Sequence, residues 1–309
     1  MNTIVVPLDG STLSEHALPY ARAAAQLFDA ELQLVQVVPT PLEPMFVESV
    51  PLRAAVQNLP EERNMPRQVT NRVAYEQAEG CLFSHAARLR ERGLHTSTEV
   101  RMGMPDEEIV SAALQHNATM IVMATHGRSG LRRWTLGSVA DKVVRSSPIP
   151  VLLIPATCPI AHEWTIRRIL VPWDGSELAA RALPLVREMA ARTHAEIVLV
   201  QAVDPLSDIE THWVPVAGDI AIIRRNEALE QLKDITDDLS RNGLRSAAVA
   251  ILSYPSETIL EEAIRQHADL IIMVTHGYGG MRRVALGSVA DRVLHATTTP
   301  LLLVHPADA

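Results

Sequence analysis

Cysteine and aromatic residues are scarce in this chain of 309 residues. The two cysteines, Cys81 and Cys158, have neither the spacing of a redox or metal motif nor the number that a disulfide framework needs, which favours a reducing compartment. Aromatic residues make up 4% of the chain, too few for the stacking platforms that bind single-stranded nucleic acid.

Dense basic runs and long apolar runs are missing as well. A net charge of −8 without a basic cluster argues against binding to nucleic acid or to anionic membranes. No stretch approaches the ~18 uninterrupted apolar residues of a membrane span, and the N-terminal residues do not resemble a signal peptide. We therefore expect a cytoplasmic protein whose partners include neither nucleic acid nor a membrane.

The most prominent feature that the sequence does contain is a duplication. Thirteen of twenty positions match between residues 125–144 and 275–294, and the matches include polar residues and glycines. Core packing tolerates many apolar exchanges, so repeated polar residues at fixed offsets indicate a retained backbone geometry or site. The length of the chain independently favours two domains of about 150 residues each.

The spacing between matching residues places an insertion in the first copy. Asp9 matches Asp174 at an offset of 165, whereas Gly137 matches Gly287 at an offset of 150, so the first copy carries fifteen extra residues. They fall in a segment of about residues 39–78, which we expect to be an irregular surface excursion because it holds six prolines. The predicted boundaries are a first domain at 1–157, a linker at 158–166 and a second domain at 167–309.

Within each copy, short β-branched apolar runs alternate with longer helical patterns. The pattern predicts strands at 3–6, 31–38, 120–124 and 151–154, with counterparts at 168–171, 196–203, 270–274 and 301–304, and helices at 15–28 and 177–192. Continuous apolar strands that alternate with helices are typical of a parallel sheet covered on both faces. The predicted fold class is therefore α/β, with two doubly wound Rossmann-like domains, each an open five-stranded mostly parallel sheet with helices on both faces.

The first candidate site segment follows the first strand of each copy. Residues 7–11 read Pro-Leu-Asp-Gly-Ser, and residues 172–176 read Pro-Trp-Asp-Gly-Ser. Doubly wound folds bind ligands beyond the carboxyl ends of their strands, so Asp9 and Asp174 are placed to recognise a polar group of a ligand such as a purine. The alternative is that Asp and Ser only cap the helix that follows.

The second candidate site segment is the duplicated one. Thr125-His126-Gly127 follows a buried strand, and after nine further residues Gly137-Ser138 opens an expected helix. Glycine lets a backbone approach a ligand closely, and a helix N-terminus attracts phosphate through its unpaired N–H groups and its dipole. Turn chemistry alone also explains a Gly and a Ser before a helix, but their duplication favours an anion site.

Other devices for binding phosphate or for catalysis are missing from the sequence. It contains no GxxxxGK[ST], GxGxxG or GxSxG motif. Its twelve histidines show no HExxH motif and no Cys/His metal spacing. We therefore predict neither catalytic nor metal-ligating residues.

The two segments together resemble the universal stress protein family in its tandem form, with one family domain in each copy. The nucleotide signature of that family is Gly, two residues, Gly, nine residues, then Gly followed by Ser or Thr. Gly127 with Gly137-Ser138, and Gly277 with Gly287-Ser288, match its later part. The resemblance implies binding of ATP, ADP or AMP, with Mg²⁺ accompanying ATP, and a regulatory or stress-response role with at most slow ATP hydrolysis.

The resemblance also implies roles for individual residues. Asp9 and Asp174 would contact adenine together with the backbone at Val37 and Ala202, while the glycines and serines of the signature would surround ribose and phosphates. The full set implied for the two sites is Pro7, Leu8, Asp9, Val37, Met123, Ala124, His126, Gly127, Gly137, Ser138 and Val139 in the first copy, and Pro172, Trp173, Asp174, Ala202, Val274, His276, Gly277, Gly287, Ser288 and Val289 in the second.

The sequence departs from the family signature at its first glycine, which is Ala124 in one copy and Val274 in the other. A β-branched side chain intrudes further than a methyl group where backbone approaches a ligand. In addition, Trp173 replaces the small or aliphatic residue expected before the Asp. We predict that the first copy binds nucleotide better than the second; the alternative is an interaction module without nucleotide, whose sites have been degraded.

The resemblance further implies how the copies associate. Family members commonly pair through their last strand, which here covers residues 150–154 and 300–304. A tandem chain would make this pairing internal and leave another face for a homodimer. The sequence does not identify a protein partner.

Overall fold

The chain folds into two halves with the same order of elements. The computed structural model describes residues 2–39, 67–125, 136–158, 163–204, 217–275 and 286–305. The first half comprises β1 (Asn2–Pro7), α1 (Thr12–Glu15), α2 (Leu18–Phe28), β2 (Ala30–Pro39), α3 (Arg67–Arg90), β3 (Thr96–Gly103), α4 (Pro105–Gln115), β4 (Ala118–Ala124), α5 (Ser138–Ser146) and β5 (Val151–Ile154). The second half comprises β6 (Arg168–Pro172), α6 (Glu177–Ala180), α7 (Leu183–Thr193), β7 (Glu196–Val203), α8 (Ala217–Arg241), β8 (Ser246–Leu252), α9 (Pro255–Arg265), β9 (Leu270–Val274), α10 (Ser288–Ala296) and β10 (Leu301–Val304).

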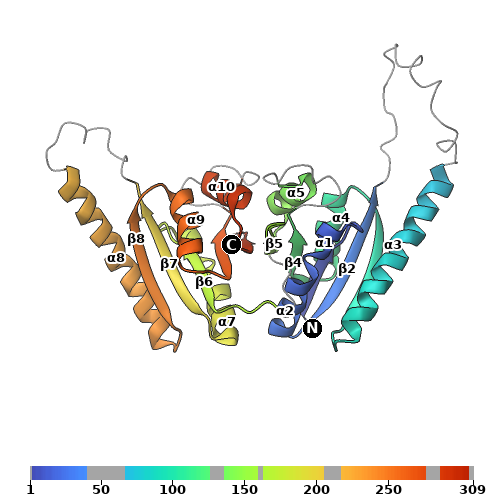
Figure 1. Cartoon of the computed structure of the whole chain (residues 1–309), viewed down its shortest axis with the longest axis horizontal. Coiled ribbons are helices and arrows are strands. Elements are labelled where there is room, and N and C mark those ends of the chain that lie inside the picture. Colours follow the sequence, from blue (N-terminus) through green and yellow to red (C-terminus); the bar gives the residue numbers. More distant parts are fainter. Residues whose placement is uncertain are drawn as a thin grey trace, which may run out of the picture.

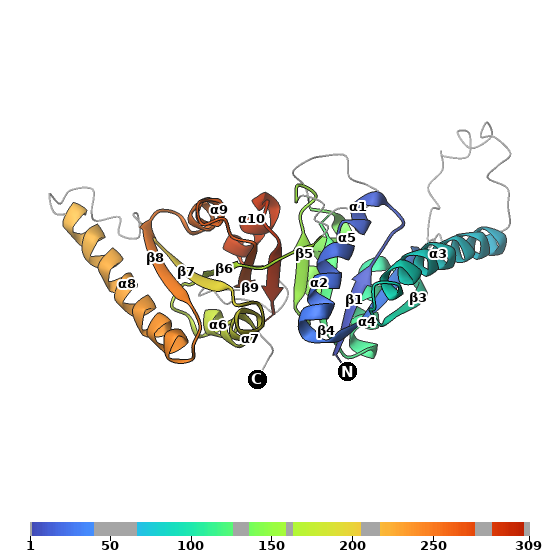
Figure 2. The same cartoon turned by 60° about the horizontal axis from the view of Figure 1, so that its bottom comes forward.

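These strands form one ten-stranded sheet in the order β3-β2-β1-β4-β5-β10-β9-β6-β7-β8 (Figure 1). Within each half the neighbouring strands are parallel. In the first half β1 lies between β2 and β4, so the chain winds away from β1 in both directions. The predicted fold class, two doubly wound α/β halves, is therefore confirmed. Figure 2 shows α3 and α8 at the two outer ends of the molecule.

Side chains of each strand pack alternately into two cores, one on each face of the sheet. In β1, Ile4 and Val6 belong to the core that includes residues of α2 and α3, whereas Val5 belongs to the core that includes residues of α4 and α5. All three are fully buried, as is typical of a parallel sheet with helices on both faces. The middle of β1 therefore offers nothing to a ligand, and the available positions lie at the strand ends.

The first helix of each half is shorter than the sequence pattern predicts. The helix expected at 177–192 is divided into α6 and α7, and the helix expected at 15–28 is replaced by α1, which ends at Glu15, and α2, which begins at Leu18. Pro19 and Pro184 in the first turn of the longer helices cause the break, because proline lacks an N–H and its ring clashes with a preceding turn.

Among the described helices, none is long and apolar enough to cross a membrane.

The prediction that about residues 39–78 are irregular is wrong for the C-terminal part of this segment. Pro39 is the last residue of β2, and α3 begins at Arg67, directly after Pro66, so residues 67–78 are helical. A helix can form there because Pro66 is the last proline of the segment, and every residue of α3 supplies a backbone N–H. Residues 40–66 lie outside the described residues.

The two halves meet at an antiparallel pair formed by their last strands, β5 and β10. Leu302 lies opposite Leu152 in this pair, and both side chains are fully buried. Above the strands, Arg145 Nη2 in α5 lies 2.8 Å from Asp291 Oδ1 in α10, and Figure 1 shows the two helices next to each other. These contacts confirm the expected pairing of the last strands within one chain.

The segment between β5 and β6 is anchored to both halves. The Trp164 ring lies 5.2 Å from the ring of Tyr20 in α2, and Trp164 Nε1 donates a hydrogen bond to the carbonyl of Asp269 at 3.3 Å. Cys158 Sγ donates to the carbonyl of Thr298 at 3.2 Å, and burial raises the pKa of this thiol to about 11. The described residues on either side of positions 159–162 are therefore held against the two halves, Cys158 by a contact with the second half and Trp164 by contacts with both.

We expect Leu152→Ala and Leu302→Ala each to lower the free energy of unfolding by about 2–5 kcal/mol, because each leaves a cavity in a packed core. The loss in the double variant should differ from the sum of the single losses by about 0.5–3 kcal/mol, since the two side chains face each other across the junction. Urea unfolding of the four proteins measures this coupling.

The matched control combines Leu302→Ala with Leu34→Ala. Leu34 is also fully buried, but it lies in β2, with β1, β4 and β5 between it and β10. The free energy of unfolding lost in Leu34→Ala should therefore add to the free energy lost in Leu302→Ala. Additive losses for the junction pair as well would contradict a shared core at the junction.

We expect the protein to lose stability as pH rises from about 9 to about 11, partly through Cys158. Burial raises the pKa of this thiol in the folded state, so the thiol of the unfolded chain loses its proton at a lower pH. The contribution of Cys158 to the free energy of unfolding is therefore complete below the pKa of the unfolded state, and it disappears as pH rises through the pKa of the folded state. A shift of this size corresponds to roughly 2–3 kcal/mol. Cys158→Ala should flatten the pH dependence of urea unfolding in this range, whereas Cys81→Ala should retain the wild-type slope. An unchanged slope in Cys158→Ala would refute the assignment.

Candidate functional site

A cavity of about 460 Å³ opens at the carboxyl ends of β1, β2 and β4 in the first half. It lies where the chain leaves β1 toward strands on both sides, which is where doubly wound sheets bind ligands. Its volume is in the range of small-molecule sites. Of the residues implied by the sequence, the cavity brings together Pro7, Leu8, Asp9, Val37, Met123, Ala124, Gly137, Ser138 and Val139. His126 and Gly127 lie outside the described residues.

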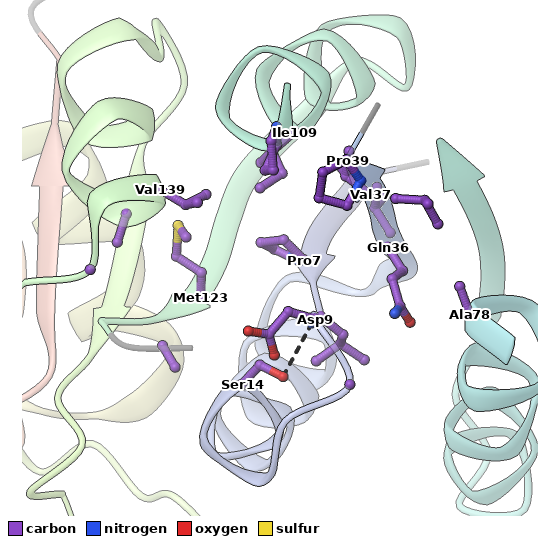
Figure 3. Close-up of a pocket in the computed structure, with 18 of the residues that line it drawn as sticks. Pro7, Asp9, Ser14, Gln36, Val37, Pro39, Ala78, Ile109, Met123 and Val139 are labelled. Carbon is purple, nitrogen blue, oxygen red and sulfur yellow. Dashed lines mark hydrogen bonds between the residues drawn. The ribbon is translucent and has the colours of Figure 1, made fainter. Parts of the chain in front are cut away.

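The loop after β1 holds Asp9 in a defined orientation. Asp9 Oδ1 accepts hydrogen bonds from Ser11 N at 2.9 Å and from Ser11 Oγ at 2.6 Å. Ser11 in turn caps α1 by accepting a bond from Ser14 N at 3.2 Å, and Asp9 N donates to Ser14 Oγ at 3.3 Å (Figure 3). The helix cap is therefore Ser11, and the Asp9 carboxylate both orients that serine and borders the cavity.

The N-terminus of α5 forms another wall of the cavity. Gly137 precedes the helix, and its N–H donates to the carbonyl of Thr125 at 2.7 Å. Ser138 is the first helical residue and so does not occupy the capping position. The N–H groups of Ser138, Val139 and Ala140 have no acceptor within the helix, as in the first turn of any α-helix. Together with the positive end of the helix dipole, they make this wall attractive to an anion.

Apolar side chains line the space between the loop after β1 and α5. Met123 and Val139 lie on one side of it, and Ile109 and Val37 on another (Figure 3). Met123 is 6% exposed and Ile109 3% exposed, so the surrounding core holds this lining in place. An apolar slot bordered by one carboxylate and one helix N-terminus suits a ligand with a flat apolar body and an anionic group.

Several lining residues were not predicted from the sequence. They include Gln36 in β2, Ala74, Gln77, Ala78 and Cys81 in α3, and Pro105 and Ile109 in α4. The packing of α3 on β2 and β3 has no local sequence signal, since this helix follows a proline-rich segment. Gln36 does have one: it recurs as Gln201 at the same offset of 165 that relates Asp9 to Asp174.

The second half repeats the same backbone arrangement. Asp174 Oδ1 accepts hydrogen bonds from Ser176 N at 3.0 Å and from Ser176 Oγ at 2.6 Å. Gly287 donates from its N–H to the carbonyl of Thr275 at 2.8 Å, directly before α10. The other implied residues occupy the corresponding strand and helix ends: Pro172 ends β6 and Trp173 follows it, Ala202 lies in β7, Val274 ends β9, and Ser288 and Val289 begin α10. His276 and Gly277 lie outside the described residues.

The side chains around this backbone differ between the halves. Trp173 stands at the position of Leu8 and packs half-buried against the core. On α8, Arg224 stands at the position that Ala74 occupies in α3, at the same offset of 150 that relates Gly137 to Gly287. The second half therefore carries larger side chains at positions where the first half leaves a cavity.

Comparison with known proteins finds relatives over the whole chain. The model of the universal stress protein family matches residues 1–155 and 165–305. A universal stress protein of Mycobacterium tuberculosis is 26% identical over 307 residues, which cover 97% of this chain and 96% of the relative. One of Methanocaldococcus jannaschii is 32% identical over 151 residues, which cover 49% of this chain and 80% of the relative. The crystal structure of a universal stress protein from Archaeoglobus fulgidus aligns over 98% of both chains with a TM-score of 0.71 and 20% identity, which indicates the same fold.

We expect a maleimide at neutral pH to modify Cys81 before Cys158. Cys81 is partly exposed and lines the cavity, whereas Cys158 is 6% exposed and its raised pKa keeps the thiol protonated. Peptide mass spectrometry after timed labelling measures both rates. Cys81→Ala should label only after unfolding in urea, and faster labelling of Cys158 in the folded wild type would contradict the burial of Cys158.

Proposed function

Because this chain belongs to the universal stress protein family, with a family domain in each half, we propose that it is a regulatory stress-response protein that binds ATP, ADP or AMP in the cavity of its first half. The observation that carries the proposal is the composition of this one cavity. It combines the carboxylate of Asp9, an apolar slot and the N-terminus of α5, which correspond to the amino group, the ring and the phosphates of an adenine nucleotide.

The slot suits the adenine ring. A flat heterocycle between Met123, Val139 and Ile109 would remove its apolar faces from water, which is the main source of affinity in such pockets. Asp9 borders the same space with a carboxylate that Ser11 already orients. A carboxylate has about four acceptor positions, so it can receive the exocyclic amino group in addition to the two bonds from Ser11.

The N-terminus of α5 suits the phosphates. Gly137 has φ −66° and ψ 142°, and Gly287 has φ −61° and ψ 146°. Any residue adopts these angles, so backbone conformation does not explain why both positions are glycine. Close approach of a ligand to the backbone does explain it. A phosphate at this point would meet the N–H groups of the first turn and the hydroxyl of Ser138.

We propose nucleotide binding with at most slow ATP hydrolysis. Fast phosphoryl transfer needs acidic residues that hold Mg²⁺ and a group that positions the attacking water. Within the part of the chain that the structure describes, no group of three His, Cys, Asp or Glu side chains could hold a metal ion. Mg²⁺ would therefore arrive with the phosphates of ATP, and the role of the protein is to bind and to respond.

The first half is the better site by the same reasoning. Ala124 ends β4 at the cavity, whereas the equivalent position at the end of β9 carries the larger, β-branched Val274. Trp173 adds a large ring at the position where the first half has Leu8. We propose that the first half binds nucleotide more tightly than the second.

We expect Asp9→Ala to weaken ATP binding by about 10- to 100-fold, since a hydrogen bond to a charged group contributes about 1.5–3 kcal/mol. Asp174→Ala should leave the tight affinity unchanged. Isothermal titration calorimetry on the full chain measures both. Asp9→Asn is the control for folding: it keeps an oxygen for the two bonds from Ser11, so its melting temperature should match that of the wild type while ATP binding is still weakened.

Two outcomes would contradict these expectations. Equal losses of affinity in Asp9→Ala and Asp174→Ala would refute the difference between the halves. A wild-type protein without affinity for ATP up to millimolar concentration would refute nucleotide binding. The second outcome would favour the alternative function, an interaction module whose sites were lost at Ala124 and Val274.

A further inference from the structure

One side chain in the cavity has a polar atom without a partner. Gln36, near the end of β2, is 8% exposed, and its Oε1 has no hydrogen-bond partner in the described part of the chain. Figure 3 shows its amide pointing into the space between Asp9 and Ala78 of α3. An amide oxygen that leaves water without gaining a bond raises the free energy of the folded state.

Folding alone does not explain a glutamine at this position. Leu32, Leu34 and Gln36 lie on the same face of β2, because side chains alternate along a strand, and both leucines are fully buried. An apolar residue would continue this row without burying an unpaired oxygen. The second half nevertheless repeats the residue as Gln201, whose Oε1 is also buried without a partner among the described residues. The same free-energy cost of a buried, unpaired amide oxygen thus occurs in both halves, which indicates a ligand that supplies the missing donor.

Building on the nucleotide site proposed above, we propose that Gln36 Oε1 accepts a hydrogen bond from the exocyclic amino group of the bound purine. Gln36 thereby selects 6-amino purines over 6-oxo purines. A side-chain amide oxygen is an acceptor and requires an N–H or O–H from the ligand. Adenine offers an N–H at this position, whereas hypoxanthine offers a carbonyl oxygen, which either faces Oε1 as a second acceptor or requires the amide to turn over and leave Oε1 unpaired again.

The position of Gln36 relative to Asp9 supports this assignment. Both border the same cavity, and Figure 3 shows the end of the Gln36 side chain in the space between Asp9 and α3. An amino group carries two N–H bonds, so it can donate to both side chains at once. Asn and Gln recognise adenine through the same pairing of amide oxygen and amino group when proteins contact DNA bases.

The test compares ATP with inosine triphosphate, which carries oxygen in place of the amino group, by calorimetry on the full chain. The wild type should prefer ATP, and Gln36→Met should reduce the ratio of the two affinities by about tenfold, mainly through weaker ATP binding. Gln36→Glu keeps an acceptor at the same place and should retain the preference. Gln201→Met, the same change in the second half, should leave the ratio at the tight site unchanged.

Stability separates this role from a structural one. Methionine continues the apolar row of Leu32 and Leu34, so Gln36→Met should unfold at the same urea concentration as the wild type or at a higher one. An unchanged ratio in Gln36→Met overturns this inference and leaves the proposed function intact. Failure of the wild type to bind either nucleotide overturns both. An equal fall of the ratio in Gln36→Met and Gln201→Met also overturns the assignment to the first half.

Discussion

The pairing of β1 with β2 on one side and with β4 on the other is the constraint on which the candidate site depends. Because all three strands are parallel, the chain returns over one face of the sheet to β2 and over the other face to β4, and the loops at their carboxyl ends diverge. The strand interiors are buried on both faces. Polar chemistry is therefore confined to this edge, where Asp9, Gln36 and the N-terminus of α5 meet although they lie far apart in the sequence.

The junction between the halves pairs two strands that would otherwise be edge strands of the sheet. An unpaired edge strand can pair with another chain, and β5 and β10 cover each other's edges and leave β3 and β8 at the outer ends. The helix α5 takes part in both arrangements, since its N-terminus borders the cavity while Arg145 links it to Asp291 of α10 across the junction. This double role gives a physical reason why the segment containing these helices is the most strongly duplicated part of the sequence.

Local patterns predicted much of the fold and of the candidate site. The four apolar runs at 151–154, 196–203, 270–274 and 301–304 form strands with the predicted bounds, because a continuous apolar segment is stable only where helices cover both faces. The prediction failed where one proline changed the local backbone: Pro19 divides the first helix, and Pro66 marks the point after which α3 can form. Asp9 and Gly137 were identified as candidates because each belongs to a sequence segment that the chain contains twice.

The sequence by itself determined the chemistry of the loop after β1, since the side-chain hydrogen bonds that shape it join residues at most five positions apart, as between Asp9 and Ser14. It also determined that two copies exist and that their flanking side chains differ. Only the tertiary structure decided which side chains share one space. The wall formed by α3 and the direction of Gln36 follow from the packing of a helix and a strand against each other, and such packing depends on contacts between segments distant in the chain, which leave no local pattern.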